Sequence, residues 1–166
     1  MLVKNIMNMI KTRGFTLIEL IMVIIIVGMI AIVVTPQWTA TSLSLEYQAR
    51  QLLEDVRYAQ ALSIVSGQRY RWVGTSSATY QITNESGVAI LFPSGSSSIT
   101  LTGGITISSY TNLPSSLIAF DSFGAPYTTT AIPGTALAST AVITLTAQGA
   151  TRSIQIIPQT GFGIIV

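Results

Sequence analysis

The sequence predicts an α+β protein in which a long N-terminal helix is followed by an antiparallel β domain. Three observations predict this fold class. Residues 15–34 are almost wholly apolar, residues 37–66 contain a helical apolar spacing, and short β-branched and aromatic runs alternate with Gly, Ser, Pro and Asn from residue 67 onward. The 166 residues, 49% of them hydrophobic and only 8% charged, suffice for one modest domain with accessory segments.

The first element is the apolar run at residues 15–34, in which Glu19 is the only charge. A helix of this length spans about 30 Å, the thickness of a bilayer core. Its fourteen Ile, Leu, Val and Phe residues favour insertion by roughly 4–8 kcal/mol, whereas one carboxylate costs about 3 kcal/mol. The run therefore predicts a transmembrane helix over residues 15–36, with Pro36 as a helix break.

The positive charge of the chain is concentrated before this run, at Lys4, Lys11 and Arg13. After residue 14, five arginines face six carboxylates, so the net charge of +2 says little about binding to nucleic acid. By the positive-inside rule, the three leading cations keep the N-terminus cytoplasmic and place the rest of the chain outside.

The chain contains no cysteine and no histidine. This excludes disulfides, thiol chemistry and zinc sites built on these residues, and no carboxylate-rich loop is present for calcium, so we expect neither a metal nor a cofactor. Without His and Cys, and without Lys after residue 14, the usual nucleophile–base pairs cannot be built. Glu85 and Asp121 are the only carboxylates of the β domain, and nothing in the sequence places them in one cleft. We therefore expect that this protein is not an enzyme.

A carboxylate such as Glu19 is unusual in an apolar helix, because it disfavours insertion into lipid. An uncleaved signal anchor with an accidental glutamate is one interpretation. Residues 13–20, however, read RGFTLIEL, which resembles the class III signal of type IV pilins and type II secretion pseudopilins. In that family a prepilin peptidase cuts after the glycine. The resemblance implies a cleaved leader at residues 1–14, cleavage between Gly14 and Phe15, and N-methylation of Phe15.

The same resemblance implies a role for Glu19. Cleavage creates a positive amine at Phe15, and Glu19 lies one helical turn further on the same face. In a filament of parallel helices, the carboxylate of one subunit meets the amine of a neighbour. Since an ion pair in low dielectric is strong only when both partners are present, Phe15 and Glu19 are expected to form an assembly ion pair.

Residues 37–66 are expected to form an amphipathic stalk helix. Apolar residues recur at spacings of 4, 3, 4 and 3, which predicts a continuous seam that packs on a sheet: Leu45, Ala49, Leu52, Val56 and Ala59. A second stripe carries charges of alternating sign, spaced for ion pairs: Glu46, Arg50, Glu54 and Arg57. Gly67 is a natural stop.

Residues 67–166 are expected to form a β-rich domain outside the inner membrane. The predicted strands are 69–73, 79–83, 88–92, 99–101, 105–108, 117–120, 141–145, 152–157 and 163–166. Residues 147–150 read AQGA and predict a hairpin turn, whereas residues 122–140 are expected to be an irregular loop. Residues 120–126 read FDSFGAP, where Asp121 is suited to cap its own turn.

This C-terminal part resembles the GspH/FimT family of minor pilins and pseudopilins, in the stretch before the first strand, in FDSFGAP and in the last strands around a glycine. The resemblance implies two antiparallel sheets packed on the long helix. Some relatives in the FimT branch take up DNA through basic residues at the C-terminal hairpin. Here that hairpin holds only Arg152, and Arg69 and Arg71 join it only if the first strand lies nearby. Three phosphate contacts are few against the 6–10 of strong binders, so nucleic acid is an unlikely partner.

Two functions follow from these resemblances. In the first, the chain is a minor pilin or pseudopilin that primes or caps a type IV pilus or a type II secretion pseudopilus. Its expected partners are other pilins or pseudopilins through the N-terminal helix, the prepilin peptidase, the inner-membrane assembly platform and, before assembly, the lipid bilayer. In the second, it is a pilus subunit whose globular domain binds an extracellular ligand, either DNA for uptake or a surface glycan.

Overall fold

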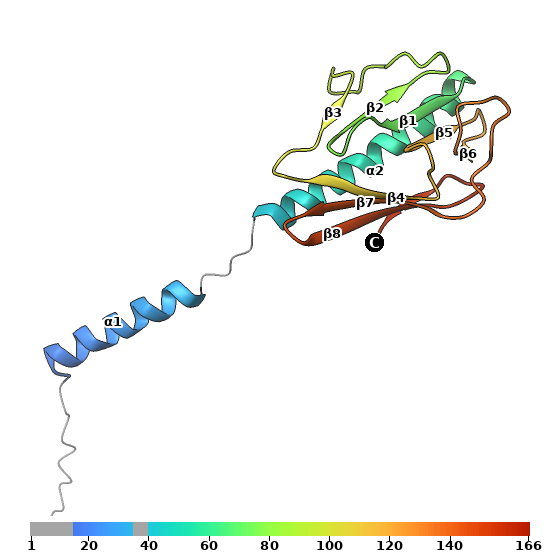
Figure 1. Cartoon of the computed structure of the whole chain (residues 1–166). Coiled ribbons are helices and arrows are strands. Elements are labelled where there is room, and N and C mark those ends of the chain that lie inside the picture. The colour runs from blue at the N-terminus through green and yellow to red at the C-terminus, as the bar shows by residue number, and fades with distance from the viewer. Residues whose placement is uncertain (1–14, 35–39) are drawn as a thin grey trace, which may run out of the picture. The chain divides into compact units, whose positions relative to one another are not determined.

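The computed structural model describes residues 15–34 and 40–166. The chain divides into two compact units, Met1–Gln37 and Trp38–Val166. The described part of the first unit is built around helix α1, Leu17–Val34. The second unit contains helix α2, Ala40–Ser66, and the strands of the β domain (Figure 1). The predicted leader at residues 1–14 and the predicted helix break at Pro36 lie outside the described residues. Within the described ranges, no helix is both long enough and apolar enough to cross a membrane.

Helix α2 has the predicted amphipathic pattern. The five residues of the predicted seam are at most 1% exposed: Leu45, Ala49, Leu52, Val56 and Ala59. The charged stripe forms two ion pairs, Glu46 with Arg50 and Glu54 with Arg57, each at 2.7 Å. Gly67 ends the helix with a φ of 70°, a left-handed conformation that glycine adopts without penalty, and its N–H donates to the carbonyl of Ser63.

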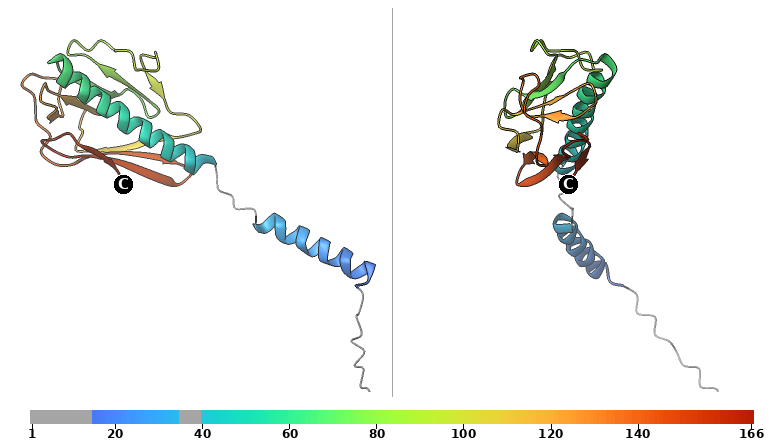
Figure 2. Two further views of the ribbon diagram at one scale, coloured as in Figure 1. Left: turned by 180° about the vertical axis from the view of Figure 1, so that it is seen from behind. Right: turned by 90° about the vertical axis from the view of Figure 1, so that its right-hand side faces the viewer.

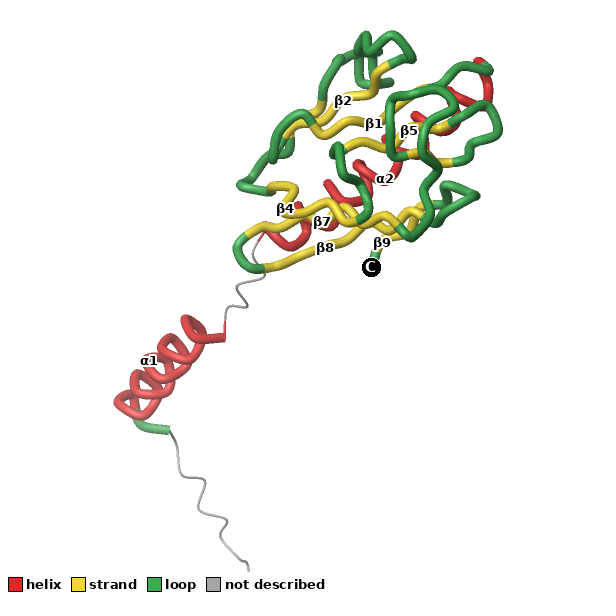
Figure 3. Tube along the Cα trace, turned by 45° about the vertical axis from the view of Figure 1, so that its right-hand side comes forward, coloured by secondary structure: helices red, strands yellow, loops and turns green. Residues whose placement is uncertain are grey.

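The strands form two antiparallel sheets (Figures 1 and 3). The first sheet has the order β3-β2-β1-β5-β6, and the second has the order β4-β7-β8-β9. The strands of the first sheet are β1 Tyr70–Gly74, β2 Thr79–Thr83, β3 Ile99–Thr100, β5 Leu117–Phe120 and β6 Pro126–Tyr127. Those of the second sheet are β4 Thr106–Thr111, β7 Ala141–Ala147, β8 Ala150–Ile156 and β9 Gly163–Ile165.

The predicted hairpin is present between β7 and β8. Ala147 pairs with Ala150 across a two-residue loop. Both loop residues, Gln148 and Gly149, have positive φ values of 48° and 83°. This is the left-handed geometry that matches the twist of the flanking strands in a tight hairpin.

Helix α2 lies against both sheets and closes one core (Figure 2). The first sheet contributes buried aromatic residues, among them Trp72, whose ring centroid is 5.3 Å from that of Tyr80. The second sheet contributes branched aliphatic side chains such as Ile143 and Ile154, which are 0% exposed. The predicted α+β fold, with a helix packed on two antiparallel sheets, is confirmed.

One strand prediction and one loop prediction are corrected by the structure. Residues 88–92 form no strand and make only a single bridge, between Thr83 and Ala89. The run is apolar because it packs against the core: Phe92 is 4% exposed, and its ring lies edge-on against the ring of Tyr80. The expected irregular loop at 122–140 contains the short strand β6, which starts at Pro126. A proline is tolerated there because β6 is at the edge of the first sheet.

Candidate functional site

The start of α1 is the first candidate site. The side chain of Phe15 is 75% exposed, and Glu19 is exposed as well. The hydroxyl oxygen of Thr16 accepts a hydrogen bond from the N–H of Glu19 at 3.3 Å, so Thr16 is the N-cap of the helix. Thr16 was not among the site residues predicted from the sequence. Its signal was present, since a threonine followed three residues later by a glutamate is the spacing of a capping box.

The surface of α1 is the second feature of this site. Every side chain from Phe15 to Met29 is exposed, and apart from Thr16 and Glu19 the polar residues that mark a solvent-facing stripe are missing from these positions. Ile24 and Ile26, which point to different sides of the helix, are 62% and 54% exposed. A helix that is hydrophobic all round is stable only when other apolar groups cover it. The apolar surface of α1 therefore lacks the polar side chains that would suit it to water on every side.

Gly14, the residue before the expected cleavage, lies outside the described residues. The predicted cut between Gly14 and Phe15 and the methylation of Phe15 therefore stay predictions, as does the ion pair of Phe15 with Glu19.

Two of the three arginines considered for DNA contact have an internal role. Arg69 and Arg71 are 9% and 7% exposed. The guanidinium of Arg69 donates to the carbonyl oxygens of Ala131 and Pro133 at 2.7 and 3.0 Å and lies 4.3 Å from the centre of the Tyr127 ring. These contacts tie the segment after β6 to the start of β1.

Arg71 completes this anchor. Its guanidinium donates to the carbonyl oxygens of Glu85 at 2.7 Å and Thr130 at 3.2 Å. Burial lowers the pKa of Arg71, and the neighbouring charge of Arg69 lowers it further. Because side chains alternate along a strand, Arg71 points to the face of the first sheet opposite that of Trp72, which packs in the core beside α2.

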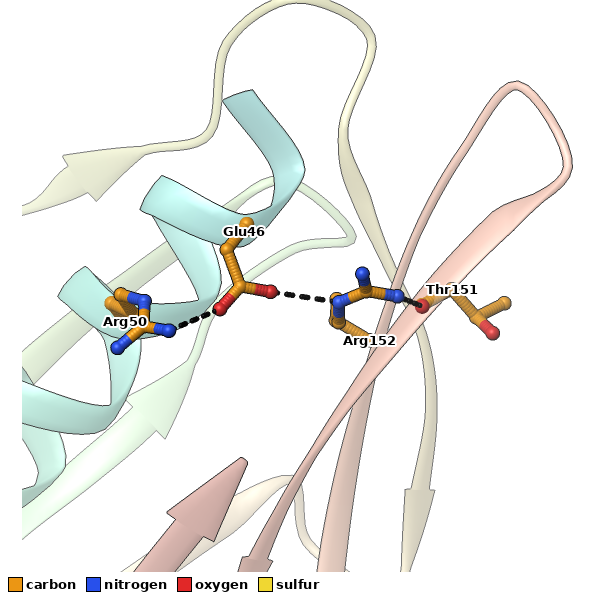
Figure 4. A network of polar contacts seen from close by, with 4 residues as sticks. All are labelled: Glu46, Arg50, Thr151 and Arg152. Carbon is orange, nitrogen blue, oxygen red and sulfur yellow. Dashed lines mark hydrogen bonds and ion pairs between the residues drawn. The ribbon is translucent and has the colours of Figure 1, made fainter. Parts of the chain in front are cut away.

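Arg152 lies elsewhere, on β8 of the second sheet. Its Nε donates to Glu46 Oε2 at 2.8 Å, and the other carboxylate oxygen of Glu46 accepts from Arg50 at 2.7 Å (Figure 4). The hydrogen bond from Arg152, followed by the hydrogen bond from Arg50, lowers the pKa of Glu46. Arg69 and Arg71 were expected to join Arg152 only if the first strand lay nearby. In the structure β1 and β8 belong to different sheets, and Arg152 reaches α2 while Arg71 faces away from it.

Asp121 has the predicted capping role. Its Oδ1 accepts hydrogen bonds from the N–H groups of Phe123 and Ala125, both at 2.9 Å, and its Oδ2 accepts from the hydroxyl of Tyr127 at 3.2 Å. The structure places Glu85 and Asp121 in the lining of one cleft of about 180 Å³, a proximity that nothing in the sequence indicated. Since both oxygens of Asp121 are already engaged, this carboxylate serves the turn. Among the described residues, no three His, Cys, Asp or Glu side chains gather as a metal site.

A further titratable pair joins α2 to the first sheet. The hydroxyl of Tyr80 donates to Asp55 Oδ2 at 2.7 Å. Burial raises the pKa of Asp55 to about 6, against a smaller lowering by the Tyr80 bond. Burial also raises the pKa of Tyr80 far above its usual range. This pair was not predicted from the sequence, although Asp55 follows Leu52 by three residues and so lies at the edge of the apolar seam.

Comparisons with known proteins agree with these features. Residues 9–35 match the prokaryotic N-terminal methylation motif. The type IV minor pilin FimU of Pseudomonas aeruginosa has a similar crystal structure, with a TM-score of 0.52 and 15% sequence identity over 74% of this chain and 87% of that chain. No curated protein matches the sequence. The chain thus carries the prokaryotic N-terminal methylation motif and has a fold similar to that of a type IV minor pilin.

Proposed function

Proceeding from a pilin-like motif and fold, we propose that the chain is a minor pilin or pseudopilin that primes or caps a filament of a type IV pilus or a type II secretion system. The observation that carries the proposal is the exposed and all-round apolar surface of α1, with one carboxylate near its start. Lipid covers this surface before assembly, and the α1 helices of other pilins or pseudopilins cover it in the filament. The subunit acts through assembly and not through catalysis.

The proposed life cycle assigns each segment a role. The chain enters the bacterial inner membrane with residues 1–14 in the cytoplasm, residues 15–36 in the bilayer and the β domain in the periplasm. Prepilin peptidase removes the leader after Gly14, and Phe15 becomes the methylated N-terminus. The assembly platform then transfers the subunit into the filament, where the amine of Phe15 pairs with a neighbouring Glu19 carboxylate, or Glu19 with a neighbouring amine.

The capping-box spacing of Thr16 and Glu19 makes this proposal testable, because it offers the Glu19 side chain a second, local role. Glutamine at the same position preserves the pattern of a capping box but carries no charge. If Glu19 acts through the ion pair, Glu19→Gln and Glu19→Ala both lose incorporation into filaments. If it acts through the cap alone, Glu19→Gln retains incorporation.

Thr16→Ala is the matched control. It removes the cap, which costs about 1 kcal/mol of helix stability, and leaves the charge of Glu19 in place. Incorporation is measured by the amount of subunit in sheared filaments and by co-purification with partner pilins from detergent-solubilised membranes. Normal incorporation of Glu19→Gln contradicts the ion-pair proposal.

The genomic neighbourhood separates the two machines. Genes for a secretin, an ATPase and pseudopilins beside this one assign it to secretion, whereas adhesin or retraction genes assign it to a pilus. Of the alternative ligands, DNA is disfavoured by the internal contacts of Arg69, Arg71 and Arg152.

A further inference from the structure

A groove runs between the first half of α2 and the segment 96–102, which contains the edge strand β3. Its volume is about 490 Å³, within the range of small-molecule sites. None of its ten lining residues is charged, and eight of them carry a hydroxyl or an amide: Ser44, Tyr47, Gln48, Gln51, Ser96, Ser98, Thr100 and Thr102. The groove is therefore neutral and rich in groups that both donate and accept hydrogen bonds.

The floor of the groove is held in place by a buried amide. Gln48 is 6% exposed, and its Nε2 donates to the carbonyl oxygen and the hydroxyl of Thr102, both at 3.2 Å. In return, the N–H of Thr102 donates to Gln48 Oε1 at 3.0 Å. Because these bonds join α2 to the segment after β3, the two walls keep their spacing without a ligand. Such preorganisation lowers the entropy lost on binding.

Other polar groups along the groove remain available. The N–H of Leu101 donates to the carbonyl of Ala78 at 2.7 Å, so the backbone of the preceding residue, Thr100, points away from β2. β3 is the outermost strand of the first sheet, so no other strand in the described part of the chain pairs with the backbone N–H and C=O groups of Thr100. The amide of Gln51 and the hydroxyl of Tyr47 likewise make no hydrogen bond within the described residues.

Tyr47 supplies the remaining feature. Its side chain is 68% exposed at the rim of the groove, so one aromatic face is open to a ligand. A sugar ring matches this combination, because its C–H face stacks on an aromatic ring while its hydroxyls exchange hydrogen bonds with amides and hydroxyls. An added peptide strand needs apolar pockets for alternate side chains, and only Ile99 and Leu101 of the lining are aliphatic.

We propose that this groove binds a neutral carbohydrate, about the size of a disaccharide, with Tyr47 as the stacking platform and Gln51 and the Thr100 backbone as hydrogen-bonding groups. The absence of charge from the lining residues disfavours sialylated or sulfated sugars, which need cationic partners. The proposal is independent of the proposed filament role, because it concerns only the second unit.

Saturation-transfer NMR on the full chain tests the proposal, in a phosphocholine detergent that carries no sugar head group. The probes are maltose, cellobiose, lactose and diacetylchitobiose, with N-acetylneuraminic acid as the charged comparison. We expect transfer to at least one neutral disaccharide and none to the acidic sugar. Tyr47→Ala is expected to weaken that binding by roughly two- to tenfold, the range for one aromatic contact, and Gln51→Ala to weaken it as well.

Leu43→Ala is the matched control. Leu43 is 69% exposed on the same helix, one turn before Tyr47, and does not line the groove. This variant is expected to bind like the unchanged chain, and equal melting temperatures show that the variants are folded. The proposal is overturned by the lack of transfer to all four neutral sugars, or by equal transfer in Tyr47→Ala. Transfer to an extended Thr-Val-Thr-Val peptide in place of the sugars assigns the groove to a peptide strand and also overturns it.

Discussion

Replacing Asp55 by Asn is expected to stabilise the β domain at neutral pH. Asp55 is partly buried between α2 and the first sheet, and its carboxylate accepts the hydroxyl of Tyr80 at 2.7 Å. The carbonyl oxygen of an asparagine accepts the same hydrogen bond, and its NH₂ group turns toward the exposed side. Asp55→Asn therefore removes the charge that burial disfavours and keeps the contact with Tyr80.

The size of the effect follows from the pKa of Asp55, which burial raises from 3.8 to about 6. A pKa difference of this size corresponds to about 3 kcal/mol of the free energy of unfolding at a pH where the carboxyl group is fully ionised. Because part of the carboxyl group is in contact with water, solvent screening reduces the expected value to about 1–2 kcal/mol.

The sign of the pH dependence is opposite to that of an acid in a salt bridge. Above pH 4 the unfolded chain releases the Asp55 proton freely, whereas the folded chain retains it until about pH 6. The free energy of unfolding thus falls as the pH rises from about 4 to about 6 and is constant above that window. Glu46, whose pKa is lowered, contributes the opposite slope at lower pH, and it does so equally in the variant and in the unchanged chain.

Urea denaturation of residues 38–166 between pH 4 and pH 8 measures this effect. Asp55→Asn is expected to equal the unchanged unit at pH 4 and to exceed it by about 1–2 kcal/mol at pH 7. Glu54→Gln, which removes the exposed neighbouring carboxylate, is the control and is expected to change stability by less than about 0.5 kcal/mol. A lower stability of Asp55→Asn at pH 7, or a difference that does not vary with pH, refutes the reasoning.

Three further predictions concern other parts of the chain. Mass spectrometry of membrane-extracted protein is expected to show a methylated chain beginning at Phe15, and a chain beginning at Met1 in peptidase-competent cells contradicts cleavage. Leu52→Asp is expected to lower the free energy of unfolding of residues 38–166 by more than about 4 kcal/mol, because Leu52 is 0% exposed. Leu43→Asp, on the exposed side of the helix, is the control and is expected to change it little. An unchanged melting temperature of Leu52→Asp contradicts the packing of the seam on the sheets. The same unit is expected to bind DNA more weakly than about 10⁻⁴ M at about 150 mM salt in a fluorescence-anisotropy titration. Low-micromolar affinity that is lost in Arg152→Ala contradicts this expectation.

The order of the amino acids was sufficient for features that depend on neighbours along the chain. The apolar seam of α2 was predicted from spacing alone, because residues three and four apart share a helix face. The ion pairs of Glu46 with Arg50 and of Glu54 with Arg57 follow from the same geometry. The hairpin turn at Gln148 and Gly149 was predicted from residue type.

The run at residues 88–92 shows where this reasoning stops. Its five consecutive apolar residues, VAILF, are typical of a buried strand, yet no strand of the fold pairs with it for more than one bridge. A strand needs a partner, and the partner is set by the order of the whole sheet. Phe92 instead packs its ring next to Tyr80, so this run contributes to the core without forming the hydrogen bonds of a strand pair.

The contacts that govern the candidate sites depend on the tertiary structure, because they join residues far apart in the chain. Arg69 meets the carbonyl of Ala131 across 62 positions, and Arg152 meets Glu46 across 106. The sequence shows these arginines only as cations without partners. In the fold, Arg69 donates hydrogen bonds to carbonyl oxygens and Arg152 donates one to a carboxylate. The groove beside Tyr47 likewise exists only because the edge strand β3 comes to lie along α2. Helical periodicity and charge spacing act over one turn, whereas burial and pairing are decided by which segments the two sheets bring together.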